Sequence, residues 1–228
     1  MIVTAEEFRI MKLLVIKDWQ IYQKQLAAYV VGLIIGLTLV GMSKVWSFYG
    51  GGLLLLVLLI CVGGFAIQSS LLNERKEQTL PFVMSMPVTP MMHYWSKLIS
   101  NVTIYLAPFT LVVAGTAFVV LYTPIPDGVL VWAILIYGFL AVNFFLSLCT
   151  ALVVESEGWN IFAQIGLSTL ISPFMLAIGS IDAIHSQTRT NNVAWGSAAV
   201  AILALEIAVI VLAIVITGAI HRRKVSFL

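Results

Sequence analysis

The sequence predicts an all-α membrane protein in which all 228 residues form one transmembrane domain with six transmembrane helices. Hydrophobic residues make up 61% of the chain and charged residues only 10%, whereas soluble domains average about 45–50% and about 25%. Six long apolar segments account for this composition, and none of them contains Lys or Arg. Membrane β-barrels show short alternating segments instead. These observations exclude a water-soluble globular enzyme.

Each apolar segment is long enough to cross the hydrocarbon layer, about 30 Å thick, as a helix. A helix also satisfies its own backbone hydrogen bonds, as lipid requires. The predicted spans are Leu26–Met42, Gly50–Leu72, Leu98–Tyr122, Val129–Val154, Ile161–Ile181 and Ala194–Ile220. The charged first 25 residues lack the apolar core and cleavage site of a signal peptide, so we expect the N-terminus to be kept.

The basic residues are distributed unevenly between the two sides of these spans. Of the 12 Lys and Arg residues, only Lys44 and Arg189 lie on the side opposite the chain termini. Basic residues concentrate in cytoplasmic loops. We therefore expect both termini to be cytoplasmic in a multi-pass arrangement.

The segment before the first span, residues 4–25, has the pattern of an amphipathic helix. Thr4 and Glu7 form a capping-box signal. Apolar residues then recur every three or four positions, at Phe8, Met11, Val15, Trp19, Tyr22 and Leu26. Such a helix can lie in the headgroup layer with its basic residues toward anionic lipid. Leu13, Ile16 and Ile21 lie off this stripe, so the helix either only anchors the chain or also touches a cytoplasmic partner.

The loop between the second and third spans, residues 73–97, is the most informative segment. Thr79 can cap a short helix over Leu80–Met86, with Pro81 in its first turn, that ends before Pro87. This helix would have a hydrophobic surface outside the lipid, formed by Phe82, Val83, Met84 and Met86. Exposed apolar patches of this kind usually mark a protein contact.

The same loop resembles the signature of the type-2 ABC exporter permeases. The matching positions are the acidic Glu74 and Glu77, the helix-opening Thr79 and Leu80, the turn Ser85, Pro87, Val88 and Thr89, and the basic Lys97 that opens the third span. One departure is Gln78, where the family usually has Gly. The resemblance also covers the layout of an N-terminal helix, six spans and a longer outer segment before the last span.

The resemblance implies a coupling helix that docks on a separate ATPase subunit in a prokaryotic inner membrane. The expected coupling residues are Glu74, Glu77, Thr79, Leu80, Phe82, Val83, Met86 and Pro87. We expect no catalytic site, metal or cofactor on this chain, with ATP and Mg on the partner. The Gly36–Gly41 spacing is followed by Met42 and Ser43 rather than Lys and Ser or Thr, so it is not a P-loop. The family also implies pairing with a second permease copy or a paralogue.

Two polar residues inside the spans are candidates for a transport pathway. Glu206 is the one ionisable residue deep in a predicted span, and Asn143 is a possible partner. Intramembrane acids are candidate functional residues by default. Glu206 could instead tie helices together through Tyr137, Asn143 or Gln164, or lie protonated at a dimer seam. Gly32 and Gly36 favour a close helix contact, a weak signal for a dimer face. Pro173 predicts a kink in the fifth span.

The resemblance implies an exporter, and the mostly apolar spans with few fixed charges favour amphiphilic or hydrophobic cargo, such as a peptide, a lipid-linked molecule or a drug-like compound. The alternative is a membrane assembly or immunity protein that binds a cytoplasmic partner without transporting anything. A membrane-embedded enzyme would need a convergent polar site, which the sequence does not indicate. The net charge of +2 gives no support for a nucleic-acid partner.

Overall fold

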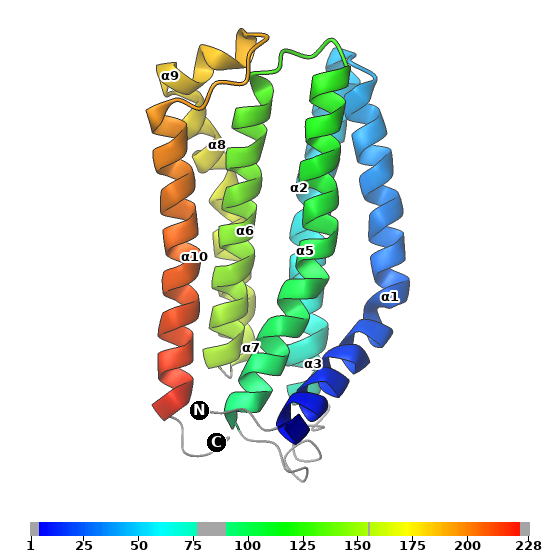
Figure 1. The fold of residues 1–228 in the computed structure, drawn as a ribbon, viewed down its shortest axis with the longest axis vertical. Coiled ribbons are helices and arrows are strands. Elements are labelled where there is room, and N and C mark those ends of the chain that lie inside the picture. Colours follow the sequence, from blue (N-terminus) through cyan, green and yellow to red (C-terminus); the bar gives the residue numbers. More distant parts are fainter. Residues whose placement is uncertain (1–4, 77–89, 155, 224–228) are drawn as a thin grey trace.

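The computed structural model describes residues 5–76, 90–154 and 156–223, and these residues form a bundle of long helices (Figure 1). Within this described part, six segments are long and apolar enough to cross a membrane, which confirms the predicted all-helical fold and a multi-pass membrane protein. The main helices are α1 (Ala5–Gly41), α2 (Val45–Ile67), α5 (Pro90–Tyr122), α6 (Val129–Val153), α7 (Glu157–Thr169), α8 (Ile171–Gly179) and α10 (Ser197–Arg223).

The first helix differs from its predicted boundaries. A surface helix over 4–25 and a span over 26–42 were expected as separate units, but α1 runs unbroken from Ala5 to Gly41. Its N-terminal part slants relative to the rest (Figure 1). Tyr22 of the apolar stripe is buried against the bundle, while Leu13, Ile16 and Ile21, which lie off the stripe, are exposed. Nothing between residues 22 and 29 breaks helical geometry, so the chain continues without a turn.

The second span ends in an unusual way. After α2, residues Gln68–Leu72 form the π-helix η1, and Asn73–Lys76 form the short helix α3. A π-turn is wider than an α-turn and occurs often at functional positions. It changes the direction in which the following side chains project. Glu74 on α3 therefore projects toward Lys97 and Lys17, a direction that differs from the one it would have in an unbroken α-helix.

The fifth span is broken rather than continuous. The chain leaves α7 at Thr169 and starts α8 at Ile171, with Leu170 between them. Pro173 stands in the first turn of α8, where its missing N–H leaves no intrahelical bond unmade. The predicted kink is thus present, three residues before the proline.

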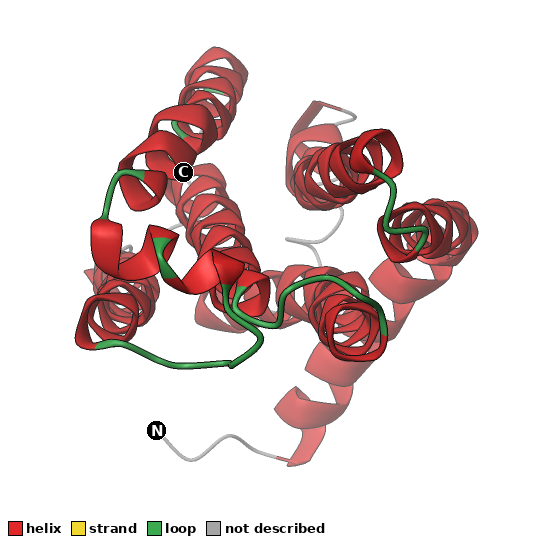
Figure 2. Ribbon diagram, turned by 90° about the horizontal axis from the view of Figure 1, so that it is seen from above, coloured by secondary structure: helices red, strands yellow, loops and turns green. Residues whose placement is uncertain are grey.

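The two ends of the bundle differ. The end where α1 begins, α3 lies and α10 finishes is called here the terminal end (Figure 1). At the other end, α9 (Asp182–His185) and the 3₁₀ turn η2 (Gln187–Arg189) lie across the helix ends (Figure 2). Gly128 donates its N–H to the Thr190 carbonyl at 3.0 Å, which holds this segment against the start of α6.

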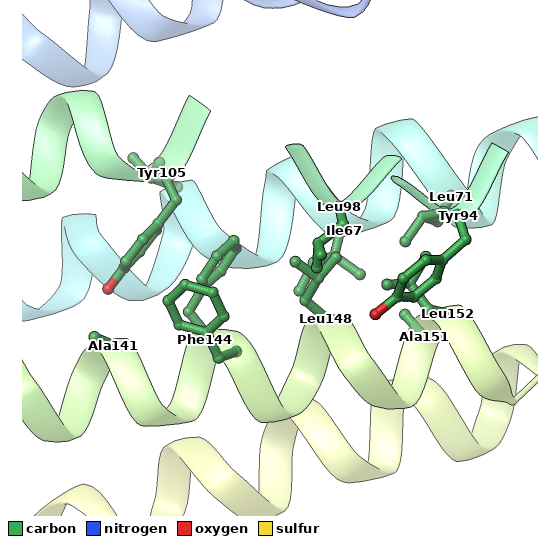
Figure 3. Close-up of a cluster of buried hydrophobic side chains, with 12 residues drawn as sticks. Ile67, Leu71, Tyr94, Leu98, Tyr105, Ala141, Phe144, Leu148, Ala151 and Leu152 are labelled. Atoms are coloured by element: carbon green, nitrogen blue, oxygen red, sulfur yellow. The ribbon is translucent and has the colours of Figure 1, made fainter. Parts of the chain in front are cut away.

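The largest group of buried side chains joins α2, α5 and α6. Tyr105 stacks on Phe144 with ring centroids 4.0 Å apart, and Leu98 and Leu148 continue the contact toward the terminal end (Figure 3). With α10 packed along it and α7 and α8 on another side, α6 is the central helix. This arrangement leaves broad apolar faces on the outside, as a membrane protein requires.

Candidate functional site

A buried charge cluster lies at the terminal end of the bundle and consists of Lys17, Asp18, Glu74 and Lys97. The Lys97 ammonium is 2.8 Å from a Glu74 carboxylate oxygen and 3.2 Å from the nearer Asp18 oxygen. Lys17 donates to the same Glu74 oxygen at 3.1 Å. Two acids and two bases therefore balance each other, and they join α1, α3 and α5.

Burial of this charge cluster costs free energy, because its charged groups are removed from water. The side chains of Lys97 and Asp18 are 6% and 3% exposed, whereas that of Lys17 is 49% exposed. Removing a charged group from water costs several kcal/mol, and the cost is recovered only with well-placed opposite charges. Lys97 has two such partners, so it is the centre of the cluster. Lys17 lies at the water-exposed rim and contributes much less.

Two effects act in opposite directions on Glu74. Burial raises the pKa of its carboxyl group, but the positive charges and hydrogen bonds of Lys97 and Lys17 outweigh burial and hold this pKa below the ordinary value. Glu74 is therefore a carboxylate at neutral pH, and it stays negative while the two lysines remain in place.

Neutral polar contacts extend the connection between the same helices. Asn101 donates to the Lys97 carbonyl at 2.8 Å and accepts from the Ser70 hydroxyl at 2.9 Å, which ties η1 to α5. The Trp19 indole donates to the Thr103 hydroxyl at 3.1 Å, which ties α1 to α5. At the terminal end, polar bonds thus add to the apolar packing of the helices.

The structure brings together two of the residues that the family resemblance singled out. Glu74 and Lys97 are 23 positions apart in sequence and form an ion pair at the two ends of the predicted coupling loop. The other predicted coupling residues, Glu77, Thr79, Leu80, Phe82, Val83, Met86 and Pro87, lie outside the described residues, as does the short helix predicted over Leu80–Met86. Their contacts stay a prediction.

Asp18 is the functional candidate that the sequence patterns missed. It lies three positions after Val15 and four before Tyr22, so it occupies the apolar stripe of α1. An acid on the buried face of a helix requires a buried basic partner. A buried basic partner could therefore have been predicted from the sequence, but its identity as Lys97 depends on the position of α1 beside α5.

Glu206 lies in the seam between α10 and α6, separate from the charge cluster. It is 5% exposed, and neither carboxylate oxygen has a hydrogen-bond partner among the described residues. It faces Gly138, and a Cβ atom at that position would overlap the carboxylate. The predicted hydrogen bonds from Glu206 to Tyr137, Asn143 or Gln164 are therefore absent from the described structure. Tyr137 bonds to Thr116 instead, and Asn143 bonds to Ser168.

Asn143 faces α7 rather than Glu206. Its amide donates to the Ser168 hydroxyl at 3.3 Å, and its carbonyl accepts from Ser147 at 3.4 Å. The two candidate pathway residues therefore belong to different seams of the bundle. Among the described residues, no group of three His, Cys, Asp or Glu side chains is placed to hold a metal ion.

Gly32 and Gly36 pack within the chain. A Cβ atom at Gly36 would come 2.8 Å from the Leu55 side chain, and one at Gly32 would come 3.0 Å from Leu58. Both glycines thus serve the contact between α1 and α2. The weak signal for a dimer face is explained by this internal contact.

No family model, curated protein or solved structure matches the chain. Its function is therefore inferred from its own residues and their geometry. The charge cluster is the best-defined candidate site, since it unites three elements and flanks the predicted coupling loop.

Proposed function

We propose that the chain is the membrane-spanning permease subunit of an ATP-driven ABC exporter. A separate ATPase subunit would bind residues 73–97 and drive transport. The proposal rests on the loop signature described above and above all on one structural observation. Glu74 and Lys97 pair across the two ends of this loop, and Lys97 also pairs with Asp18 of α1.

This pairing supplies a route for force. A push on the loop displaces α3 and the first turns of α5 together, because an ion pair 2.8 Å long joins them. The same push reaches α1 through Asp18. The two longest helices of the described structure, α1 and α5, would then transmit the motion across the membrane.

The orientation follows from charge. Most basic residues lie on elements of the terminal end, whereas Lys44 and Arg189 lie at the opposite end. The positive-inside rule then places the terminal end, with both termini and the loop, in the cytoplasm. This is the side on which an ATPase subunit finds ATP.

A second permease copy or a paralogue completes the proposed exporter. The cavity between α2, α5, α6 and α7 has a volume of about 20 Å³, and that between α1, α2 and α5 about 10 Å³. Neither has room for a peptide or a lipid. A wider space, of about 490 Å³, is an open apolar groove on the outside of α1 and α5. The cargo would therefore move along outer apolar faces of this kind, between two copies, which favours an amphiphilic or hydrophobic molecule.

Affinity purification tests this proposal. A tagged chain, extracted from its native membrane in mild detergent, is expected to bring with it a second polypeptide that binds ATP and hydrolyses it. The double variant Phe82→Ala/Met86→Ala should lose that polypeptide, since it removes the predicted apolar contact. Trp46→Ala is the matched control, because Trp46 is 90% exposed at the opposite end.

Two outcomes would contradict the proposal. One is a preparation without an ATP-hydrolysing subunit in native membranes. The other is a partner that binds equally well to the Phe82→Ala/Met86→Ala variant and lacks ATPase activity, which would favour the non-transporting assembly or immunity protein.

A further inference from the structure

A small cavity with a partly polar lining lies inside the bundle between α2, α5, α6 and α7, and its volume is about 20 Å³. Two glycines of α2 shape its wall. A Cβ atom at Gly64 would overlap the Gln164 amide, and one at Gly63 would come 3.0 Å from the Phe144 ring. The polar side chains of the lining are Tyr105, Asn143, Ser147, Gln164 and Ser168.

Tyr105 lines this cavity and carries an unpartnered hydroxyl. The residue is 1% exposed, and its hydroxyl has no hydrogen-bond partner among the described residues. The ring is held in place by stacking on Phe144, with an angle of 7° between the planes. Figure 3 shows the side chain reaching from α5 toward α6, with its hydroxyl near Ala141. Burying a hydroxyl without a partner is unfavourable, so this group requires an acceptor or donor.

The polar groups on the far side of the cavity have spare bonding capacity. The Asn143–Ser168 and Ser147–Asn143 bonds, 3.3 and 3.4 Å long, exceed the usual range of about 2.7–3.2 Å. An amide oxygen accepts two hydrogen bonds, and a serine hydroxyl both donates and accepts. These groups can therefore bind a further molecule without giving up their present partners.

The size of the cavity decides what that molecule is. A cavity needs a volume of about 10–15 Å³, counted as the space open to the centre of a water molecule, to hold one water. Buried waters typically make about three hydrogen bonds. A cavity of about 20 Å³ has room for one water and for nothing larger.

We propose that this cavity is a binding site for one structural water molecule, which links the Tyr105 hydroxyl on α5 to the polar side chains of α6 and α7. The water satisfies Tyr105 and adds an attachment for α7, in which Asn160 is the one fully buried residue among the described side chains. This proposal is independent of the transport function.

X-ray radiolytic footprinting of the chain in lipid nanodiscs tests the proposal. Short exposures create hydroxyl radicals from water where it is bound, and mass spectrometry then locates the oxidised side chains. Tyr105 is expected to oxidise several-fold faster than Tyr137. Tyr137 is a matched control, because it is also buried in the bundle but its hydroxyl bonds to Thr116 at 3.0 Å. In the detergent-denatured chain both tyrosines should oxidise at similar rates.

Variants of the lining separate the bound water from general accessibility. Asn143→Leu removes the amide and, because Leu is larger than Asn, also fills the cavity of about 20 Å³, whereas Ser168→Ala is a milder change. Either variant should lower the oxidation of Tyr105 toward that of Tyr137, while Thr116→Val should leave Tyr105 unchanged. Equal oxidation of Tyr105 and Tyr137 in the folded wild-type chain would overturn the proposal, and so would an undiminished rate in a folded Asn143→Leu or Ser168→Ala variant.

Discussion

Lys97 is the residue on which the charge cluster depends, because it is the common partner of Asp18 and Glu74. We expect Lys97→Met to lower the free energy of unfolding by about 3–5 kcal/mol, since it leaves the buried Asp18 carboxylate without its positive partner. Chemical unfolding in detergent micelles measures the change. Lys12→Met, at an exposed position of α1, should stay within about 0.5 kcal/mol of the wild type.

The pairing itself is tested by a double variant. Asp18→Asn removes the charge that Lys97→Met leaves unpaired, so the combined variant should be more stable than Lys97→Met alone. Additive losses in the two variants would contradict a direct interaction between these side chains.

Glu74 predicts how stability depends on pH. Its pKa in the folded chain is held below the ordinary value of 4.5 by Lys97 and Lys17, despite burial. A carboxyl group with a lowered folded-state pKa stabilises the fold fully above the unfolded-state value, and this contribution is lost as pH falls through the folded-state value. The melting temperature should therefore drop on acidification in this range. Glu74→Gln should show a shallower drop, and an identical pH profile in both proteins would contradict the assignment.

Asp18 also shows what residue patterns reveal and what they leave out. Its place on the apolar stripe could have predicted a buried ion pair, whereas the choice of Lys97 required knowing that α1 lies beside α5. The position of Glu74 depends on the π-helix before it, and no residue in Gln68–Leu72 signals that wider turn. The sequence pattern indicates which charged residues are buried, but the tertiary fold determines which of them form pairs.

At the scale of elements, α1 and α2 approach closely because glycines leave room between them. A Cβ atom at Gly51 would come 2.7 Å from the Gly36 carbonyl oxygen and 2.8 Å from the Val40 backbone nitrogen. Backbone atoms cannot turn aside as a flexible side chain can. The contact therefore depends on Gly51 rather than on the hydrophobicity of either helix.

We expect Gly51→Ala to destabilise the chain by about 1–3 kcal/mol, since it forces α1 and α2 apart. Gly50→Ala and Gly52→Ala are matched controls on the same helix, because no atom lies within 4 Å of a Cβ at either position. Alanine favours a helix over glycine by up to about 1 kcal/mol, so these controls should be neutral or slightly stabilising. Thermal unfolding of the three variants decides the matter, and equal effects would contradict the close α1–α2 contact.

The long apolar elements were predictable, whereas their ends were not. Composition and length alone predict the ends of α6 to within one residue, because an apolar span without internal proline or charged residues forms one continuous helix. The separate helix expected over residues 4–25 was wrong in its boundary, since helical geometry continues wherever no residue opposes it. The break before α8 was predicted from Pro173 but falls at Leu170, because a proline disturbs the turn that precedes it.

At the scale of the whole molecule, the orientation of the bundle makes a separate prediction. In a background without Cys61 and Cys149, single cysteines at Lys44 and Lys12 should report opposite sides of the membrane. A membrane-impermeant maleimide added to intact spheroplasts should label Lys44→Cys and spare Lys12→Cys until the membrane is broken. The reverse pattern would place the terminal end, and the predicted coupling loop with it, outside the cytoplasm.

The proposed function depends most on the binding of an ATPase subunit to the loop over residues 73–97. A photo-reactive phenylalanine analogue at Phe82, activated in native membranes, tests it most directly, with the same analogue at Trp46 as the control. We expect position 82 to crosslink to a polypeptide that binds ATP, and position 46 not to do so. A crosslink from position 82 to no protein, or the same crosslinked polypeptide from both positions, would contradict it.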